Sequence, residues 1–115
     1  MITLKTLPVS TKQEVFDQVA RHLLKQGEQS VNGQGHCKYR HENKKCAAGC
    51  LIGDDEHNLG MEGQTWAKLT SYGDCPCEHA DLIGRLQKIH DHFSVENWNQ
   101  RLKELAMDEN LNWNL

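Results

Sequence analysis

The chain has 115 residues, of which 37% are hydrophobic, and its formal net charge at pH 7 is -3. This length and apolar content predict a single domain with one core over residues 1–115. The negative charge argues against a nucleic-acid-binding protein, because such proteins usually carry a basic excess. The chain opens without the basic and then apolar stretches of a signal peptide, and no apolar run reaches the roughly 18 residues of a membrane span. We therefore expect a cytoplasmic protein without a membrane segment.

The first helix is predicted over residues 12–26. Thr11, followed three residues later by Glu14, forms a capping box that opens a helix. Gly27 is a typical residue to end it. The apolar residues between these signals recur at helical spacing and form the stripe expected to be buried: Val15, Phe16, Val19, Ala20, Leu23 and Leu24.

A β-hairpin is predicted in the middle of the chain, with strands over 37–40 and 45–47. Because side chains alternate along a strand, Arg40 points to the exposed face in this register. The opposite, buried face carries three residues: Cys37, Tyr39 and Cys46. A short apolar segment after the second strand is expected to turn into a buried helix.

Two helices are predicted over 79–93 and 95–106, and a less regular pattern favours a third over 62–72 with Leu69 and Tyr72 facing inward. The break between the helices over 79–93 and 95–106 is so short that they must form an antiparallel pair. The predicted fold class is therefore mostly α (α+β), a helical domain with one small central β-hairpin. Six apolar residues are expected to be buried and packed together: Leu23, Leu51, Ile52, Leu82, Leu86 and Leu102.

Five cysteines occur in the chain, and the odd number argues against a disulfide framework. Zinc prefers four sulfur or nitrogen ligands in a tetrahedron, and two parts of the chain offer such ligands: Cys46, Cys50, Cys75, Cys77 and His79. Their spacing is not that of a zinc ribbon or finger, and apolar residues surround the first two cysteines, which is typical of buried thiols. We expect no cofactor, and a zinc-binding protein is the alternative.

Two further patterns occur in enzymes, but each is weak evidence for catalysis in this chain. His90 and Asp91 form a dipeptide that occurs in the metal sites of phosphohydrolases, but the helical phase here predicts a buried histidine with a hydrogen-bond partner. Cys37 follows His36, but neighbouring side chains on a strand point apart, whereas a cysteine nucleophile needs a base beside it. We expect a binding protein rather than an enzyme, and an unusual Cys/His-dependent enzyme is the alternative.

The predicted binding site is centred on the hairpin and the acidic loop that follows it. Six residues are expected to form it: Tyr39, Arg40, His41, Asp54, Glu56 and His57. The planar fork of an arginine fits the oxygens of a phosphate or a carboxylate. The acidic loop also offers carboxylates for an internal ion pair with Arg40, so the pattern leaves both interpretations open.

Four sequence blocks resemble a family of small proteins encoded by phages, prophages and some bacterial genomes. They read C-x-Y-R from Cys37, K-C-A-x-G-C-L-I from Lys45, M-E-G from Met61 and L-Q-x-I-H-D from Leu86. The resemblance implies a phage-type origin, and thus the host cytoplasm, but no particular reaction. Together with the small size and acidic charge, it leads us to expect an accessory protein that binds a host protein or a small anionic ligand and so modulates host metabolism or defence. The apolar tail over 110–115 suits either its own domain or a homodimer contact.

Overall fold

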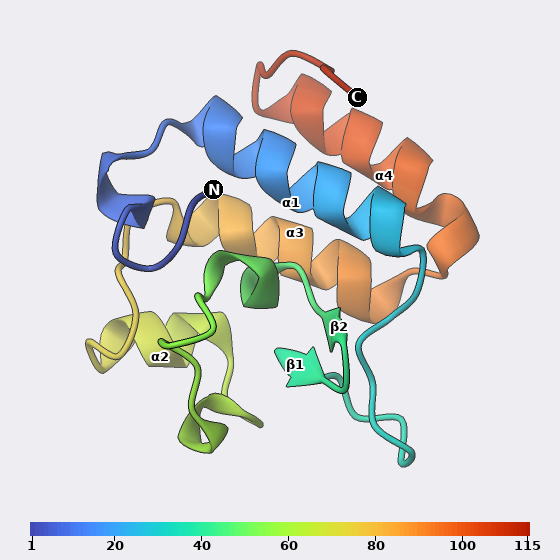
Figure 1. Cartoon of the computed structure of the whole chain (residues 1–115). Coiled ribbons are helices and arrows are strands. Elements are labelled where there is room, and N and C mark those ends of the chain that lie inside the picture. Colours follow the sequence, from blue (N-terminus) through green and yellow to red (C-terminus); the bar gives the residue numbers. More distant parts are fainter.

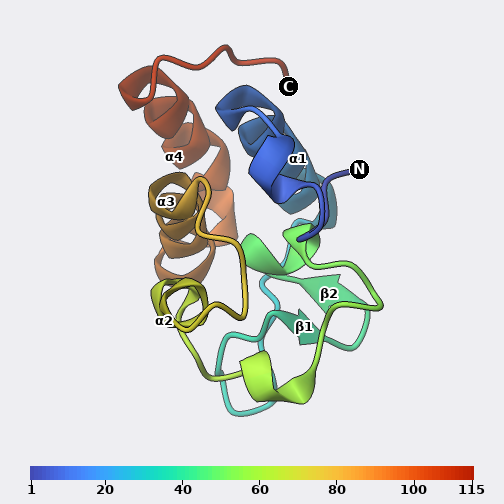
Figure 2. The same cartoon turned by 90° about the vertical axis from the view of Figure 1, so that its left-hand side faces the viewer.

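The computed structural model describes all 115 residues and contains four α-helices and one two-stranded antiparallel sheet. Three helices, α1 (Lys12–Gln26), α3 (Ala80–His92) and α4 (Val95–Asp108), pack against one another as a bundle (Figure 1). The short α2 (Trp66–Ser71), the hairpin and the connecting loops lie below the bundle (Figure 2). The predicted fold class, mostly α with one small hairpin, is confirmed.

α1 begins and ends where the sequence predicts. The Glu14 backbone N–H donates to the Thr11 hydroxyl oxygen at 3.1 Å, and the Thr11 N–H donates to the Glu14 carboxylate at 2.8 Å. Both bonds of the capping box are therefore present, and they satisfy N–H groups that the start of a helix leaves unpaired. Gly27 ends the helix at φ 63°, a left-handed conformation that glycine adopts without strain.

The core lies where the three long helices meet the 3₁₀ turn Ala48–Leu51. Each long helix turns an apolar stripe inward, because its apolar residues recur every three or four positions. The six residues predicted to be buried are at most 1% exposed and belong to one cluster: Leu23, Leu51, Ile52, Leu82, Leu86 and Leu102. None of the helices has both the length and the apolar character that crossing a bilayer requires.

The C-terminal tail packs on its own domain. Trp113 makes an edge-to-face contact with Phe16 of α1, with ring centroids 6.2 Å apart. The Asn112 backbone N–H donates to the Gln13 side-chain oxygen at 2.8 Å, and the Lys103 ammonium lies 5.6 Å from the Trp113 ring centroid. The tail thus ties the start of α1 to α4.

The hairpin is shorter than predicted. β1 (Arg40–His41) pairs antiparallel with β2 (Lys44–Lys45), so only Glu42 and Asn43 form the turn. Glu42 adopts φ 58°, the left-handed conformation that tight two-residue hairpin turns require. The predicted strands over residues 37–40 and 45–47 are therefore wrong in extent, whereas the pairing of Arg40 with Lys45 that they imply is present.

The segment before β1 explains this difference. Cys37 forms an isolated bridge with Val31, so its backbone pairs with the preceding loop rather than with the second strand. Tyr39 and Cys46 are buried as predicted, whereas Cys37 is half-buried. A Cβ atom at Gly49 would overlap the Tyr39 carbonyl oxygen, so only glycine lets the 3₁₀ turn pack directly against this segment.

α2 is shorter than the helix predicted over 62–72. Gly63 adopts φ 80°, outside the helical region, and Thr65 caps the helix by accepting a hydrogen bond from a backbone N–H three residues later. Leu69 is buried as predicted. Tyr72 is 67% exposed, so the prediction that it faces inward is wrong, because the helix has ended before it.

Candidate functional site

Arg40, the centre of the predicted binding site, is held by its own chain. Its guanidinium donates to the Asp54 carboxylate at 2.6 Å and to the Ile52 carbonyl oxygen, and its side chain is 18% exposed. The hydrogen bond from Arg40 lowers the pKa of Asp54 below its ordinary value. Of the two interpretations that the sequence leaves open for Arg40, the structure contains the internal ion pair.

The residues on either side of Arg40 do not extend this site. Tyr39 is buried, and its hydroxyl donates to the Gln64 carbonyl oxygen at 2.6 Å. His41 is half-buried, and its nearest acidic group is the Glu42 carboxylate, 3.7 Å away in the turn. Tyr39 is therefore a core residue whose hydroxyl group is already paired.

The acidic loop is also occupied with internal contacts. The Glu56 carboxylate accepts hydrogen bonds from three backbone N–H groups, those of Leu4, Lys5 and Gly53. His57 donates from Nε2 to the Glu62 carboxylate at 2.9 Å. The structure thus pairs the side chains of Arg40 and Asp54, whereas Glu56 faces the N-terminal segment. His57 shares the Glu62 carboxylate with the backbone N–H groups of Tyr39 and Arg40.

The residues of the zinc alternative are not brought together: Cys46, Cys50, Cys75, Cys77 and His79. The Cys50 thiol donates to the Ala47 carbonyl oxygen at 3.1 Å, and His79 donates from Nε2 to the Ser10 carbonyl oxygen at 2.7 Å. The chain contains one group of at least three candidate ligands within 4.8 Å of one another, and it includes none of these five. Burial raises the pKa of Cys50 to about 12, which keeps it a protonated thiol at neutral pH.

That one group consists of Cys37, His90 and Asp91. His90 is fully buried, as the sequence predicts, and its Nδ1 lies 2.7 Å from Asp91 Oδ1. The Ser30 backbone N–H lies 2.9 Å from His90 Nε2. Because a backbone N–H can only donate, Nε2 accepts, and the ring proton must be on Nδ1, which donates it to Asp91. His90 is therefore a neutral imidazole with both nitrogens in use.

The other contacts of Asp91 complete a hydrogen-bond network. The Gln87 side-chain amide donates to Asp91 at 3.0 Å and accepts from the Ala48 N–H at 2.9 Å. Burial and the Asp91 carboxylate raise the pKa of Cys37 to about 11, so this thiol is protonated. Both His90 nitrogens and the Asp91 carboxylate thus have hydrogen-bond partners within the chain. We interpret the group as a structural network that joins the loop before β1 to α3.

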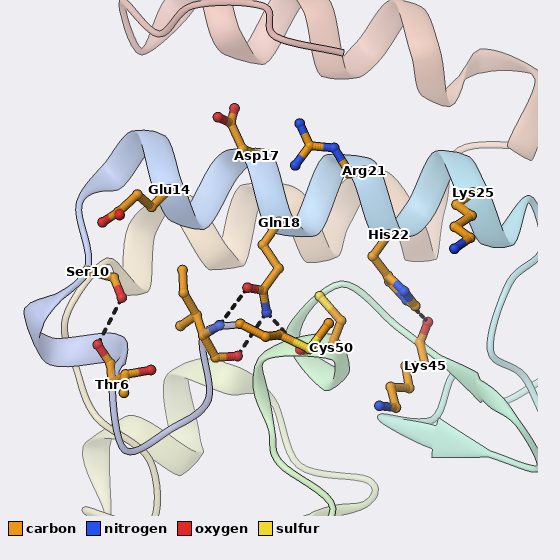
Figure 3. A pocket seen from close by; sticks show the side chains of 12 residues that line it. Thr6, Ser10, Glu14, Asp17, Gln18, Arg21, His22, Lys25, Lys45 and Cys50 are labelled. Atoms are coloured by element: carbon orange, nitrogen blue, oxygen red, sulfur yellow. Dashed lines mark hydrogen bonds between the residues drawn. The ribbon is translucent and has the colours of Figure 1, made fainter.

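A cavity of about 800 Å³ lies along the polar face of α1, and we call it the α1 cavity. Six side chains of α1 line it at helical spacing: Glu14, Asp17, Gln18, Arg21, His22 and Lys25 (Figure 3). The Gln18 amide accepts from the Ile2 N–H at 2.7 Å and donates to the Cys50 carbonyl oxygen at 3.2 Å. These bonds fix the N-terminal segment and the 3₁₀ turn as the wall opposite α1.

Positive charge gathers at the end of the α1 cavity near the C-terminus of the helix. Arg21, Lys25 and Lys45 are among the lining residues, and Figure 3 shows Lys25 toward the C-terminal end of α1 and Arg21 on the opposite side of the helix from Lys45. Arg21 and Lys25 take part in none of the ion pairs, and the Lys45 ammonium lies 3.8 Å from the Asp54 carboxylate. His22 donates from Nε2 to the Lys45 carbonyl oxygen at 2.9 Å. Burial lowers the pKa of His22. Two cations are thus available to a ligand at this end.

The sequence prediction did not include Arg21 or Lys25. Asp17 lies four residues before Arg21, and such a spacing is typical of an ordinary surface ion pair. In the structure, Asp17 instead accepts hydrogen bonds from Gln13 at 2.8 Å and from Asn114 at 3.0 Å, the latter 97 residues away in the chain. The signal that could have indicated the site is the run of basic side chains along one face near the end of α1.

Comparison with known proteins identifies no relative of this chain. No protein-family model matches it, no curated protein matches its sequence, and no solved structure matches its fold. Its function is therefore inferred from its own side chains and the cavities that they line.

Proposed function

We propose that this chain is a binding protein for a small anionic ligand, and that the ligand occupies the α1 cavity. The observation that carries the proposal is the pair of unpaired cations, Arg21 and Lys25, at one end of a cavity of about 800 Å³. Small-molecule sites usually measure about 300–1,000 Å³ and contain a few placed polar groups. Because the chain as a whole has a net charge of -3, this positive end is a local feature rather than a general basic surface.

The basic end combines cations from two elements. Arg21 and Lys25 lie one helical turn apart on α1, so their head groups can reach the same ligand. Lys45 approaches from β2, where the His22 hydrogen bond fixes its backbone. An arginine can bind two oxygens of one carboxylate or phosphate, and lysine adds a point charge beside it. The two unpaired cations available to an anionic group are therefore those of α1, because Lys45 already contacts Asp54.

The rest of the cavity suits the uncharged part of such a ligand. Thr6 and Ser10 lie at the other end of the helix with their hydroxyl groups hydrogen-bonded within the chain, and Ile2 and Cys50 supply a small apolar wall. Glu14 lines the cavity too, but its carboxylate accepts the capping hydrogen bond from the Thr11 N–H. A polar, elongated ligand with its charge at one end fits this distribution best.

The test is titration of the purified protein with pyrophosphate and with citrate, followed by calorimetry and by the thermal midpoint. We expect saturable binding that raises the midpoint, and an affinity that falls as salt is added. Arg21→Gln and Lys25→Gln should each weaken binding about tenfold, which corresponds to about 1.4 kcal/mol. Lys68→Gln is the matched control, since it removes an exposed lysine of α2 that does not line the cavity.

Two results would contradict this proposal. One is the absence of binding by either anion at low salt. The other is an equal loss of affinity in Lys68→Gln and Lys25→Gln, which would indicate general attraction by surface charge. Arg21 and Lys25 are exposed, so unchanged midpoints of the free variants should exclude unfolding as the cause of weaker binding.

For the cellular role, we propose an accessory protein of phage type that acts in the host cytoplasm. This part rests on the four sequence blocks that begin at Cys37, Lys45, Met61 and Leu86. A host protein is the other partner class that the sequence suggests, and it becomes the first candidate if the anion titrations fail.

A further inference from the structure

A second cavity, of about 390 Å³, lies between the segment before β1, the start of α2 and the middle of α3. We call it the α2–α3 cavity, and it shares no lining residue with the α1 cavity. Seven of its lining residues come from three of the four sequence blocks: Cys37, Lys38, Tyr39, Gly63, Gln87, Lys88 and Asp91. Segments far apart in the chain thus meet here around one space.

Trp66, one of the residues that line the α2–α3 cavity, carries a donor that lacks an acceptor. Trp66 is 4% exposed, and its buried indole N–H has no hydrogen-bond partner. Nearly all buried N–H groups in folded proteins are paired, and an unpaired one destabilises the fold. The Tyr39 ring lies beside the indole, with centroids 6.3 Å apart, but it supplies no acceptor. A ligand that brings an acceptor into the cavity would satisfy this donor.

The charged groups around the cavity also favour an acceptor with negative charge. Lys38 and Lys88 line it, and neither takes part in an ion pair. Asp91 lines it as well, but its carboxylate already accepts hydrogen bonds from His90 and Gln87. Because the Asp91 charge repels other anions, a ligand with one negative charge fits better than a dianion. A carboxylate meets this requirement, whereas a phosphate monoester does not.

Two glycines leave the walls of the cavity open. A Cβ atom at Gly63 or at Gly84 would find no other atom within 4 Å. Gly84 lies inside α3, where glycine is less favourable than alanine, and its φ is in the ordinary range. Neither backbone geometry nor packing therefore requires glycine at position 84. The space above it is available to the apolar part of a ligand.

We infer that the α2–α3 cavity binds a small organic carboxylate. The carboxylate oxygens accept a hydrogen bond from the Trp66 indole N–H and are neutralised by Lys38 and Lys88. The apolar part of the ligand lies against the aromatic rings and over Gly84. This site is independent of the anion site proposed at the α1 cavity.

The test uses benzoate as the probe and ¹H–¹⁵N spectra of the full chain as the measurement. The chain has three tryptophans, and the spectrum of Trp66→Phe identifies which indole signal belongs to Trp66. We expect benzoate to shift this signal saturably and downfield, as a new hydrogen bond would. Benzamide has the same shape without the charge and should bind at least about tenfold more weakly.

Two variants separate the cavity from other surfaces. Gly84→Leu fills the cavity with a side chain that favours helices, so its thermal midpoint should not fall, and the benzoate shift should disappear. Lys103→Gln on α4, which does not line the cavity, should leave benzoate binding unchanged. An unmoved Trp66 signal in the wild type would overturn the inference. So would an equal shift in Gly84→Leu, or a larger shift of this signal with pyrophosphate than with benzoate.

Discussion

His90 places a polar ring among buried residues. Its ring is fully buried, its two nitrogens bond to Ser30 and Asp91, and its centroid lies 5.6 Å from that of Trp98. The Gln29 side chain also donates to the His90 carbonyl oxygen at 2.8 Å. The side chain thus connects the loop before β1 with two helices. Its main effect on stability comes from the groups that would be left unpaired without it, since such groups cost about 1–3 kcal/mol when buried.

His90→Phe tests this role, because phenylalanine keeps a ring of similar size beside Trp98 and removes both hydrogen bonds. We expect the free energy of unfolding in urea to fall by about 1–3 kcal/mol. His92→Gln, at an exposed position of the same helix, is the control and should change it by less than about 0.5 kcal/mol. Equal stability of His90→Phe and the wild type would mean that the network does not hold the loop in place.

At the scale of elements, the long helices could be predicted and the extent of the hairpin strands could not. A capping box, a terminal glycine and an apolar stripe are local signals, and they predicted α1, α3 and α4 to within about two residues. The segment that leads into β1 is fixed instead by Glu62, whose carboxylate accepts from the Tyr39 N–H at 2.8 Å and the Arg40 N–H at 3.1 Å. A contact across more than twenty positions leaves no local pattern in the sequence.

Leu86 tests the packing of α3, the helix that contacts all the others. It is fully buried, so Leu86→Ala removes apolar contacts and leaves a cavity. We expect the free energy of unfolding to fall by about 2–5 kcal/mol, measured by chemical denaturation. Lys88→Ala, two residues later and exposed, should have little effect. A Leu86→Ala protein as stable as the wild type would show that the core tolerates the loss by collapsing around it.

At the scale of the whole molecule, the candidate sites escaped prediction because distant segments build them. Arg40 lies in a distinctive sequence block, yet its guanidinium already donates hydrogen bonds to Asp54 and Ile52. Arg21 did not stand out, and Asp17, four residues before it, accepts hydrogen bonds from Gln13 and from the C-terminal tail instead. The sequence blocks therefore contain residues that are engaged in the fold. The role of each residue depends on its tertiary contacts.

The Glu109 carboxylate links the three helices of the bundle at one end. Its carboxylate accepts from the Lys12 ammonium at 2.9 Å and from the Arg85 guanidinium at 2.6 Å, and it lies directly after α4. The hydrogen bonds from Lys12 and then Arg85 lower the pKa of Glu109 below its ordinary 4.5. A carboxyl group whose pKa is lowered by folding adds stability above its unfolded pKa and loses it as the pH falls through the folded value.

Glu109→Gln should therefore be less stable than the wild type at pH 7, and the difference should shrink as the pH falls below about 4.5. Denaturation curves at a series of pH values measure this difference. Added salt should reduce it at neutral pH as well, since the pairs lie near the surface. Glu78→Gln, at an exposed position without an ion pair, should show no such dependence. A difference in stability between Glu109→Gln and the wild type that stays constant with pH would contradict this role of Glu109.

The order of the helices along the chain has a consequence for how the protein is made. α1 ends at residue 26, whereas α3 and α4, which cover its apolar stripe, begin only at residues 80 and 95. During synthesis, the apolar stripe of α1 therefore leaves the ribosome long before the helices that cover it have been made. Such a nascent segment is an expected client for chaperones, and the bundle can close only after most of the chain has been translated.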